Sequence, residues 1–470
     1  MTDAAADMRD IIGEFRRLVV PTAQQAARAG EAADTILERV GREAARHPQV
    51  TGVELGGSYG KGTWLALPEA DIDVYVVMRP DTDSDQFERI AIEVGYNALG
   101  GYAPYKRFSD HPYVEARIDG NILANVVPCY DVAEGKWVSA ADRSRFHTAY
   151  MNRHLTEDMR CDVRLLKAFL RANGMYGAQI ERRGFSGYVA EVLVAHYGSF
   201  EMTVRGFAGI SPGAVIGKAA REFGGIVSII DPVDGNRNLA AAISRANLVR
   251  FVLACRAFTR RPSAEFFGDR GRATATGRAE GGGGGDGGAT AHKYWQNMLV
   301  VRFGFEQRAP DVIWGQAAKS ASKLAGRLER GGFAVVRYRA HVTVEKNVGH
   351  LFVLLGATTI PPVYVQQGPP FDMPDGLDAY IQKHLGDSEM MWIDRRGRLA
   401  ALRKREDTGA DSYARRLLEG GAKKDSGQQI LPGRLVGEPV VWIGSKDLDG
   451  TAAAAAEGLI RTDAAIIHLG

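Results

Sequence analysis

The segment from Gly56 to Val76 constrains the fold of this chain more than any other. An apolar stretch, VTGVEL, runs directly into the turn GGSYGKG, and the stretch DIDVYVVM that follows is rich in Val, Ile and Tyr. β-Branched and aromatic residues favour strands, and glycine and serine mark a turn between them. The pattern therefore predicts two strands joined through a glycine turn, preceded by helices over residues 10–49 that are interrupted at Pro21.

Two aspartates lie one residue apart on the second of these strands. Side chains alternate across a strand, so Asp71 and Asp73 project from one face while Ile72 points to the other. Adjacent carboxylates repel unless a cation lies between them, and Mg²⁺ prefers a few carboxylates together with water and phosphate oxygens. The pair therefore indicates a Mg²⁺ site for phosphoryl chemistry, although a polar strand end has the same pattern.

The turn before this strand carries groups suited to a triphosphate. Gly56 and Gly57 let backbone N–H groups approach phosphates closely, and the Ser58 hydroxyl and Lys61 ammonium add further donors. In-line nucleotide transfer needs metal ions at the attacking and leaving oxygens and donors at the departing pyrophosphate. A Walker A loop is excluded because no G-x-x-x-x-G-K-[ST] occurs.

Composition excludes several broad classes. The 470 residues include 59 Lys and Arg against 56 Asp and Glu, and 45% are hydrophobic, which excludes whole-chain disorder or a coiled coil. No apolar run approaches the roughly 18 to 20 residues that span a bilayer, and the start lacks signal-peptide features, so we expect a cytoplasmic protein with no membrane partner. Cys129, Cys161 and Cys255 lack C-x-x-C spacing, so neither a disulfide framework nor a thiolate zinc site is expected.

The rest of the chain divides into a hairpin, a helical middle and a mixed C-terminal part. HPYVEARIDGNILANVVPCY predicts a hairpin about Asp119 and Gly120, and apolar spacing predicts helices from Glu157 onward, including Ser186–His196 and Ala246–Phe258. The glycine tract Gly277–Thr290 predicts a flexible linker or loop.

Beyond this tract the pattern changes to strand, helix, strand and strand. That β-α-β-β order is half of a ferredoxin-like or RNA-recognition-type sandwich. Basic residues cluster further on, namely Arg395, Arg396, Arg398, Arg403, Lys404 and Arg405. The small net charge of +3 does not exclude nucleic acid, because affinity depends on such local clusters rather than on their sum.

Taken together, these motifs resemble a known family. GSYGKGTW with DIDVYV is similar to the nucleotidyltransferase signature of the DNA polymerase β superfamily. HPYVEARIDG, NVVPCYDV, DRSRFHTAYMN, RRGFSGYVAEVLVAHYGSFE and DPVDGNRNLAAAIS resemble, in order, blocks of the archaeal, class I CCA-adding tRNA nucleotidyltransferases. The resemblance is dense over about residues 10–270 and rests on plausible architecture beyond them.

The resemblance implies an α+β protein with a polymerase-β-like nucleotidyltransferase head built on a mixed sheet. Its domains would be the catalytic head over 1–150, a mainly helical nucleotide- and substrate-binding domain over 151–275, the Gly-rich linker or loop over 276–290, and a tRNA-binding C-terminal region over 291–470 with a ferredoxin-like sandwich. The activity implied is template-independent addition of C, C and A to the 3′ end of tRNA from CTP and ATP, with Mg²⁺ and release of pyrophosphate. A homodimer is left open.

Motif match also assigns roles within the head. Gly57, Ser58 and Lys61 would bind the nucleotide triphosphate, and Asp71 and Asp73 would be catalytic and hold the metal ions.

Four further positions match the family's nucleotide-binding residues, each with a structural alternative. His147, Lys167 and Tyr176 would contact the nucleotide, and Arg250 would read the base with its fixed fork of donors. The alternatives are a capping or surface histidine, a lysine that snorkels to water from an apolar helix, a tyrosine packed beside a turn, and an arginine paired at a helix edge.

One position departs from the family. Where a third carboxylate would precede V-V-P-C-Y, this chain has Asn125, whose amide oxygen can ligate a metal but cannot act as a base. Glu115 is the obvious substitute. In a two-residue hairpin about Asp119 and Gly120, however, Glu115 pairs with Ala124 and faces the opposite side, unless a bulge shifts the register.

Three functions are therefore compared. The first is an active CCA-adding enzyme, and the second is a tRNA-binding protein of the same fold with a degraded active site, which Asn125 keeps open. The third is another template-independent RNA nucleotidyltransferase, such as a poly(A)-type enzyme. The family-specific segments from His147 to Phe258 argue against the third.

Overall fold

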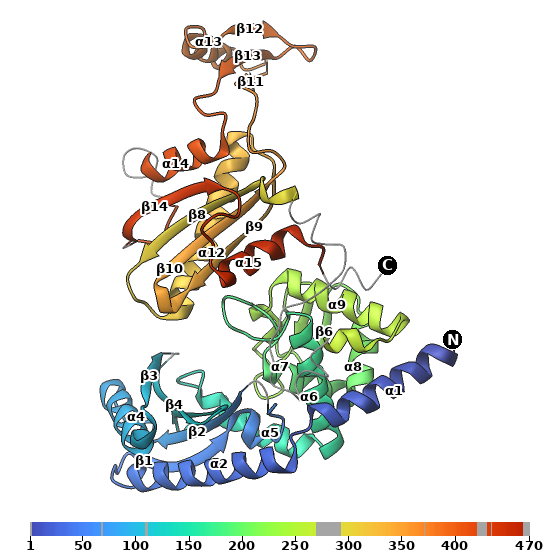
Figure 1. The fold of residues 1–470 in the computed structure, drawn as a ribbon, viewed down its shortest axis with the longest axis vertical. Helices are drawn as coiled ribbons and strands as arrows, with labels where there is room; N and C mark the ends of the chain where they lie inside the picture. The colour runs from blue at the N-terminus through green and yellow to red at the C-terminus, as the bar shows by residue number, and fades with distance from the viewer. Residues whose placement is uncertain are drawn as a thin grey trace. The chain divides into compact units, whose positions relative to one another are not determined.

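The computed structural model describes residues 2–66, 69–108, 111–268, 293–370, 372–420, 430–433 and 435–463. These form two compact units, the first comprising Met1–Gly281 with Thr462–Gly470 and the second Gly282–Arg461. Each unit is described by itself, and Figure 1 shows their elements. The expected Gly-rich linker over 276–290 lies outside the described residues.

The first unit contains a five-stranded sheet, and the prediction of a mixed sheet in this part of the chain is confirmed. Its order is β1-β2-β5-β4-β3, with β2 and β5 parallel and the other neighbours antiparallel. The strands are β1 (Val50–Gly56), β2 (Ala70–Met78), β3 (Tyr105–Phe108), β4 (Pro112–Asp119) and β5 (Ile122–Tyr130).

Two helices cover one face of this sheet, α2 (Ala23–Ala44) and α4 (Ser84–Leu99) (Figure 1). Ile72, Val74 and Val76 of β2 are fully buried in this layer. Alternate residues of a strand point to opposite faces, so Asp71 and Asp73 lie on the other face of the sheet.

The predicted interruption at Pro21 is also confirmed. Helix α1 (Thr2–Val19) ends just before it, and Thr22 caps the start of α2. The Thr22 hydroxyl accepts from the Gln25 backbone, while the Gln25 side chain accepts from the Thr22 backbone N–H. This reciprocal capping box satisfies two N–H groups that have no partner within the helix.

The β4–β5 hairpin has a different register from the simple one predicted. Between Arg117 and Asp119 of β4 the partner strand advances by only one residue, so Ile118 forms a bulge. The two turn residues are Gly120 and Asn121, because Asp119 pairs with Ile122, so the turn predicted at Asp119 and Gly120 is wrong by one residue. The bulge then adds one residue to β4, which exchanges the two faces of β4 relative to β5. Glu115 therefore lies opposite Asn125: the regular register predicted for it is wrong, and the alternative register with a bulge is confirmed.

Helices make up most of the remainder of the first unit, as predicted. They are α5 (Asp142–His154), α6 (Glu157–Ala172), α7 (Gly187–Tyr197), α8 (Phe200–Ala208) and α9 (Arg245–Arg260), with the short η1 (Gly100–Tyr102), η2 (Leu239–Ala242) and η3 (Ala264–Phe267) and the parallel strands β6 (Ala214–Ile216) and β7 (Val227–Ile229). Phe169 of α6 is fully buried at the centre of their core. Its ring contacts those of Phe200, Phe251, Phe258, Phe266 and Phe267.

An antiparallel four-stranded sheet forms the second unit, in the order β14-β8-β10-β9. Its elements are β8 (Met298–Phe305), α12 (Pro310–Gly331), β9 (Val335–Thr343), η4 (Val344–Lys346), β10 (Val348–Leu355), α14 (Ala410–Gly420), β14 (Leu435–Ile443) and α15 (Gly450–Ile460). Helices α12 and α14 share a core with one face of the sheet, and α15 packs on the other. The chain order β8-α12-β9-β10-α14-β14 confirms the predicted ferredoxin-like sandwich.

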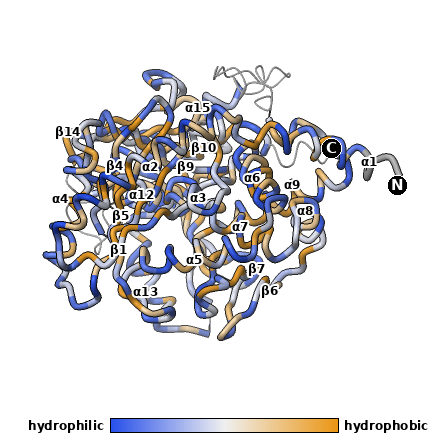
Figure 2. The backbone as a smooth tube through the Cα atoms, turned by 90° about the horizontal axis from the view of Figure 1, so that it is seen from below, coloured by the Kyte–Doolittle hydropathy of each residue, from blue (hydrophilic) through white to orange (hydrophobic). Residues whose placement is uncertain are grey.

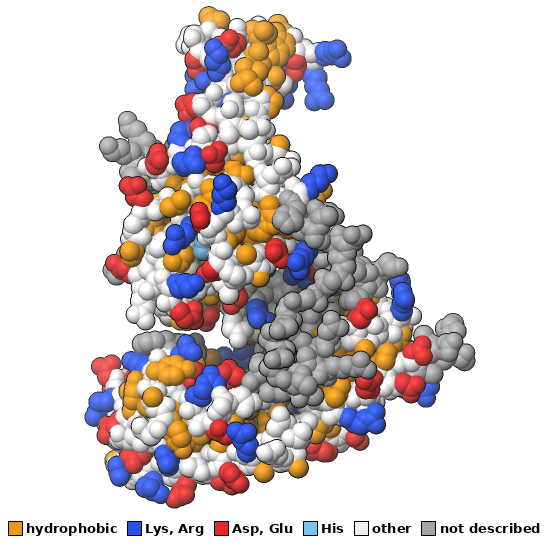
Figure 3. Space-filling model, viewed as in Figure 1, with side chains coloured by type: hydrophobic (Ala, Val, Ile, Leu, Met, Phe, Trp, Pro, Cys, Tyr) orange, Lys and Arg blue, Asp and Glu red, His pale blue; other side chains and the backbone are white. Residues whose placement is uncertain are grey.

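A small subdomain that the sequence did not predict is inserted between β10 and α14. It contains β11 (Val363–Gln367), α13 (Pro374–His384), β12 (Met390–Ile393) and β13 (Leu399–Lys404), with strand order β11-β13-β12. Figure 3 shows hydrophobic side chains gathered on it beside Lys and Arg. The exposed apolar residues include Val365, Met390 and Ile393.

The helices of both units combine hydrophilic and hydrophobic residues along their length (Figure 2). That pattern suits helices packed by one side on a core. Among the described residues, no helix is both long enough and apolar enough to cross a membrane.

The phenylalanine cluster should make Phe169 a major contributor to stability. We expect Phe169→Ala to lower the free energy of unfolding by about 3–5 kcal/mol, because the truncation leaves a cavity that five rigid rings cannot fill. Urea denaturation followed by circular dichroism measures this loss. Met202→Ala, at a half-exposed position of α8, is the matched control and should change stability by less than about 0.5 kcal/mol. Equal effects of the two substitutions would contradict the assignment.

Candidate active site

The glycine turn after β1 lies directly against the second aspartate. Gly57 has a φ of +60°, and a Cβ built on it would lie 1.7 Å from Asp73 Oδ2. A Cβ on Gly56 would lie 2.1 Å from the ring of Tyr75. The two glycines are thus required by the close approach of β2 side chains, and only four residues, Gly57–Gly60, are helical after the strand.

The two aspartates share one face of β2, as predicted. Asp71 is exposed and Asp73 is half-buried. Loss of solvation and the negative charge of Asp73 raise the pKa of Asp71 to about 6. Burial likewise raises the pKa of Asp73, although a hydrogen bond from Asn125 and the charge of Lys61 oppose it. Both carboxylates would therefore gain from a nearby cation.

A row of polar side chains continues from Asp73 across the sheet. Asp73 pairs with Asn125 of β5, Asn125 with Glu115 of β4, and Glu115 with Tyr105 of β3. Asn125 Nδ2 donates to Asp73 Oδ1 at 3.0 Å. Glu115 accepts from the Tyr105 hydroxyl and, at 3.2 Å, from Arg107. The bulge at Ile118 therefore brings a third carboxylate onto this face, one strand beyond Asn125.

This face carries oxygen donors suited to a metal, although their side chains do not converge on one point. Among the described residues, no three His, Cys, Asp or Glu side chains are arranged to hold a metal ion. Asn125 Oδ1 is buried and has no hydrogen-bond partner within the described part of the chain. Two carboxylates and this free amide oxygen are hard ligands of the kind that Mg²⁺ prefers.

Lys61 and Lys167 meet at one buried carboxylate, Glu191 of α7. Lys61 Nζ lies 2.5 Å from Glu191 Oε2, and Lys167 Nζ lies 3.1 Å from Glu191 Oε1. Thr63 donates its hydroxyl to the same carboxylate. Lys167 is only 1% exposed, so the alternative in which it snorkels to water is wrong.

His147 is neither a cap nor a surface residue. It is buried, its Nε2 lies 3.0 Å from Asp231 Oδ2, and the ring of Tyr188 stacks on it at 3.8 Å between centroids. The Tyr188 hydroxyl and Arg237 also donate to Asp231. Burial acts to raise the pKa of Asp231, but its bond to His147 and the other donors lower it to about 2.

Tyr176 lies beside Lys167 at the start of α7. A Cβ on Gly187 would lie 3.1 Å from the Tyr176 hydroxyl and 3.4 Å from Lys167 Nζ, so the glycine leaves room for both. Arg171 stacks over the Tyr176 ring at 5.2 Å, and burial raises the pKa of Tyr176 to about 12.

Arg250 of α9 contacts a different set of residues. Its Nε lies 2.5 Å from Asp463, and its Nη1 donates to Asn247 Oδ1 at 2.9 Å. The contacts seen for Arg250 are therefore those of a paired arginine at a helix edge, and its role in base reading stays a prediction.

Electrostatic interactions connect most of the other predicted residues. The charge of Lys61 acts on both Asp73 and His147, and that of Asp71 acts on Tyr176. The fold thus brings Asp73 within electrostatic reach of Lys61 in the turn after β1, and Asp71 within reach of Tyr176 in the loop between α6 and α7.

Glu191, Asp231 and Tyr188 also belong to this site, although they were not predicted from the sequence. Glu191 had a detectable signal, because it is the one charged residue within the apolar stretch GYVAEVLVA. Burying a charge at such a position costs free energy unless the charge is paired, so the position indicates a buried partner. Asp231 and Tyr188 lie in family-like segments but carry no comparable signal of their own.

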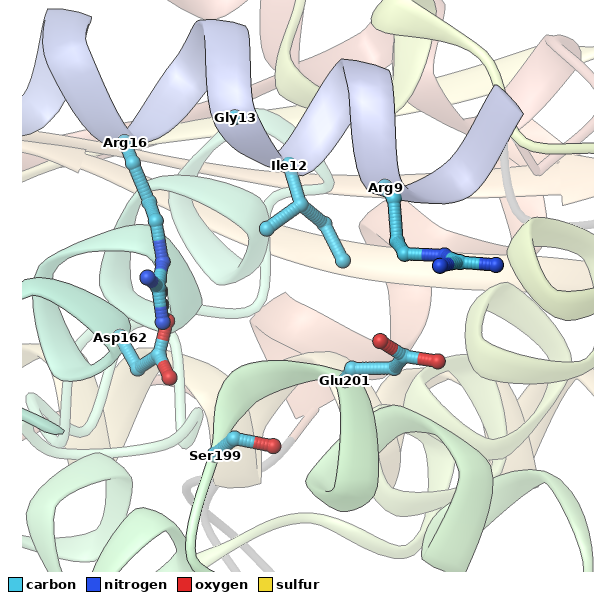
Figure 4. A pocket seen from close by; sticks show the side chains of 7 residues that line it. All are labelled: Arg9, Ile12, Gly13, Arg16, Asp162, Ser199 and Glu201. Atoms are coloured by element: carbon cyan, nitrogen blue, oxygen red, sulfur yellow. Dashed lines mark hydrogen bonds and ion pairs between the residues drawn. The ribbon is translucent and has the colours of Figure 1, made fainter. Parts of the chain in front are cut away.

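A separate cavity of about 280 Å³ lies between α1 and the start of α8 (Figure 4). Across it, Arg16 points to Asp162, with 2.7 Å between Nη2 and Oδ1. Its lining comprises Arg9, Ile12, Gly13, Arg16, Asp162, Ser199 and Glu201, none of which belongs to the predicted site.

Three family models match successive parts of the chain. The model of a nucleotidyltransferase domain matches residues 35–118, which gives the first unit a nucleotidyltransferase domain. The second domain of tRNA nucleotidyltransferase matches 161–268, and the C-terminal domain of the CCA-adding enzyme matches 296–430.

Curated relatives extend the match over most of the chain. The CCA-adding enzyme of Pyrobaculum neutrophilum is 30% identical over 88% of this chain and 95% of its own length. That of Methanopyrus kandleri is 30% identical over 87% of this chain and 86% of its own. A solved structure of a cytoplasmic RNA terminal U-transferase aligns with 56% of this chain and 98% of its own, at 13% identity and a TM-score of 0.42. The chain belongs to the family of CCA-adding enzymes.

The raised pKa of Asp71 gives a pH-dependent stability. A carboxylate whose pKa is higher in the folded state destabilises that state above this pKa, and the effect fades as the pH falls through it. We therefore expect Asp71→Asn to raise Tm at about pH 7.5 in EDTA. The free energy of unfolding should increase by about 1 kcal/mol or less, because solvent screens the group. The gain should shrink as the pH falls below about 6.

Thermal unfolding over a pH series measures this effect. Asp81→Asn is the control, because a hydrogen bond from Arg79 lowers the pKa of Asp81 and its replacement should give no gain at any pH. A Tm of Asp71→Asn equal to that of the unmodified protein at about pH 7.5 would contradict the prediction.

Proposed function

We propose that this chain adds C, C and A to the 3′ end of tRNA from CTP and ATP without a template. The observation that carries the proposal is the pair Asp71 and Asp73 on one face of β2, with Lys61 close enough for its charge to act on Asp73. In a member of the CCA-adding enzyme family, this combination suits transfer of a nucleotide with loss of pyrophosphate.

Asp71 and Asp73 would hold Mg²⁺, joined by the free oxygen of Asn125. When bound, the metal would stabilise negative charge on the attacking and leaving oxygens. The cations Lys61 and Lys167 would balance charge on the triphosphate and on the departing pyrophosphate. Gly57 leaves the space that Asp73 occupies, and Ser58 follows it at the turn.

His147 and Tyr176 would hold the nucleotide in place. The bond between His147 Nε2 and Asp231 fixes the orientation of the imidazole, which leaves its Nδ1 edge for a ligand. Tyr176 is held by Arg171 on one side and by the start of α7 on the other. Arg250 would read the base once the nucleotide replaces Asp463 as its partner.

The second unit would bind the tRNA. Its inserted subdomain combines exposed apolar residues with Arg395, Arg396 and Arg398, a surface suited to apolar contact with the RNA and to pairing of the guanidinium groups with phosphates. We place the protein in the cytoplasm. Sedimentation of the chain without tRNA tests whether it forms a homodimer.

A stepwise extension assay tests the proposed function. Transcripts ending before CCA, after C and after CC are incubated with labelled CTP or ATP and Mg²⁺. We expect CTP to be used twice, ATP once, and addition to stop there. Asp73→Ala should abolish addition while tRNA binding persists. Binding of tRNA without any addition would instead favour a tRNA-binding protein with a degraded site, and a long homopolymer would favour a poly(A)-type enzyme.

Asn125 predicts slow chemistry with intact nucleotide binding. A missing general base typically costs about 10²- to 10⁴-fold, so Asn125→Asp should raise the single-turnover rate of A addition by at least about tenfold while changing the Kd for ATP little.

Glu115 belongs to the same row of polar side chains, and its carboxylate should partly replace the negative charge that Asn125 lacks. We expect Glu115→Gln to slow the unmodified protein more than it slows the Asn125→Asp variant, because the new aspartate makes Glu115 redundant. Equal slowing in both backgrounds would assign Glu115 to holding Tyr105 and Arg107 alone.

A further inference from the structure

The cluster around Glu191 is a buried ionic network that joins the turn after β1 to helices α6 and α7. Glu191 has no exposed surface. One of its oxygens accepts from Lys61, and the other accepts from both Thr63 and Lys167. All four side chains are buried, so the network lies beneath the surface at which a nucleotide would arrive.

The two lysines differ in their remaining donors. An ammonium has three N–H donors. Those of Lys167 are engaged by the Thr63 carbonyl at 2.9 Å, the Thr63 hydroxyl at 3.1 Å and Glu191 at 3.1 Å. Lys61 makes one hydrogen bond, to Glu191, within the described part of the chain. Lys61 is therefore the residue of this cluster with donors available to a phosphate.

The charges of the network do not balance. Two buried ammoniums share one carboxylate, which leaves one positive charge in excess, and buried ions are costly unless paired. Burial lowers the pKa of Lys167, and Glu191 opposes this effect. Burial acts to raise the pKa of Glu191, but the two lysines and the hydrogen bonds lower it. The carboxylate thus favours the charged form of Lys167, and the excess positive charge of the network favours binding of an anion.

We propose that Glu191 is a positioning residue that holds Lys61 and Lys167 as fixed cations for the triphosphate. This inference rests on the proposed function, because it assumes that a nucleotide triphosphate is the anion received. Glu191 itself touches no substrate in this proposal. It acts through Lys61, whose free donors it directs, and through Lys167, which it holds against Thr63.

Equilibrium binding of ATP to the full chain tests the proposal. Glu191→Gln keeps the shape of the side chain and removes its charge, so two buried ammoniums are left without a counter-ion. Lys167 should then lose its proton more readily, and affinity should fall as the pH rises. We expect the variant to bind ATP roughly ten- to a hundred-fold more weakly than the unmodified protein at about pH 9.5, and the difference to narrow at about pH 7.

Other groups near the cluster also bear on its charge. They are Asp73 of β2, His147 of α5, Arg164 and Arg171 of α6, and Tyr176 and Tyr188 at α7. Each is present in both proteins, so comparison with the unmodified chain at every pH isolates the effect of Glu191. Glu38→Gln, which removes a carboxylate from an exposed pair with Arg42, is the control and should bind ATP as the unmodified protein does at every pH.

Two further variants keep the proposal falsifiable. Adding Lys167→Met to Glu191→Gln removes the titrating lysine. The difference in ATP affinity from the unmodified protein should then no longer depend on pH. Glu191→Asp keeps the charge but shortens the side chain, so it should fold even if Glu191→Gln does not, and should weaken ATP binding about tenfold at every pH. Unchanged affinity in Glu191→Asp, a pH-independent loss in Glu191→Gln, or pH dependence that survives Lys167→Met would overturn the proposal.

The result also separates this inference from the proposed function. If the unmodified chain extends tRNA and binds ATP but Glu191→Gln behaves like it at every pH, only the role of Glu191 is wrong. If the unmodified chain neither binds ATP nor extends tRNA, the proposed function is wrong as well.

Discussion

The rest of the first unit depends on one arrangement, in which a single buried carboxylate serves two buried ammoniums. Glu191 belongs to α7, Lys167 to α6 and Lys61 to the turn after β1, so the network ties the sheet to the helices that follow it. Removing Glu191 would leave two buried ammoniums without a counter-ion in a poor solvent for ions. This constraint fixes where the sheet face carrying Asp71 and Asp73 lies relative to α6 and α7.

A second set of contacts orders the face itself. Asp73 packs against Gly57 and accepts a hydrogen bond from Asn125, and the positive charge of Lys61 opposes the rise in its pKa that burial causes. The amide at position 125 therefore plays a part that a carboxylate there could not, because it donates to Asp73 instead of repelling it. The hydrogen bond from Asn125 stabilises Asp73 as an anion. In the reaction, however, an amide cannot act as the base that a carboxylate at this position would supply.

Much of the fold followed from patterns within short segments. Alternation placed Asp71 and Asp73 on one face, Pro21 separated two helices, and the β-α-β-β order indicated the sandwich of the second unit. Features that depend on distant partners could not be predicted in this way. The partner of Lys167 lies 24 residues away on another helix, and that of His147 lies 84 residues away in a loop.

The hairpin register was predicted wrongly for a related reason. The turn residues alone favour a regular pairing, but that pairing would turn Glu115 into the apolar layer and expose Val114 and Ala116. Both of these residues are fully buried beneath α4, where Gly95 leaves room for Val114. The cost of burying a charge exceeds that of a bulge, so the core sets the register rather than the turn.

The bulge at Ile118 has a consequence for how such chains diverge. Because the core holds Glu115 opposite Asn125 and the turn holds Asp119 opposite Ile122, the extra residue is accommodated entirely between them. A relative whose hairpin is one residue shorter could therefore lose the bulge and keep the same row of side chains beside Asp73. Insertions and deletions at this point would leave the row beside Asp73 in place. The length of this hairpin can therefore vary among relatives, whereas the residues on its two faces cannot.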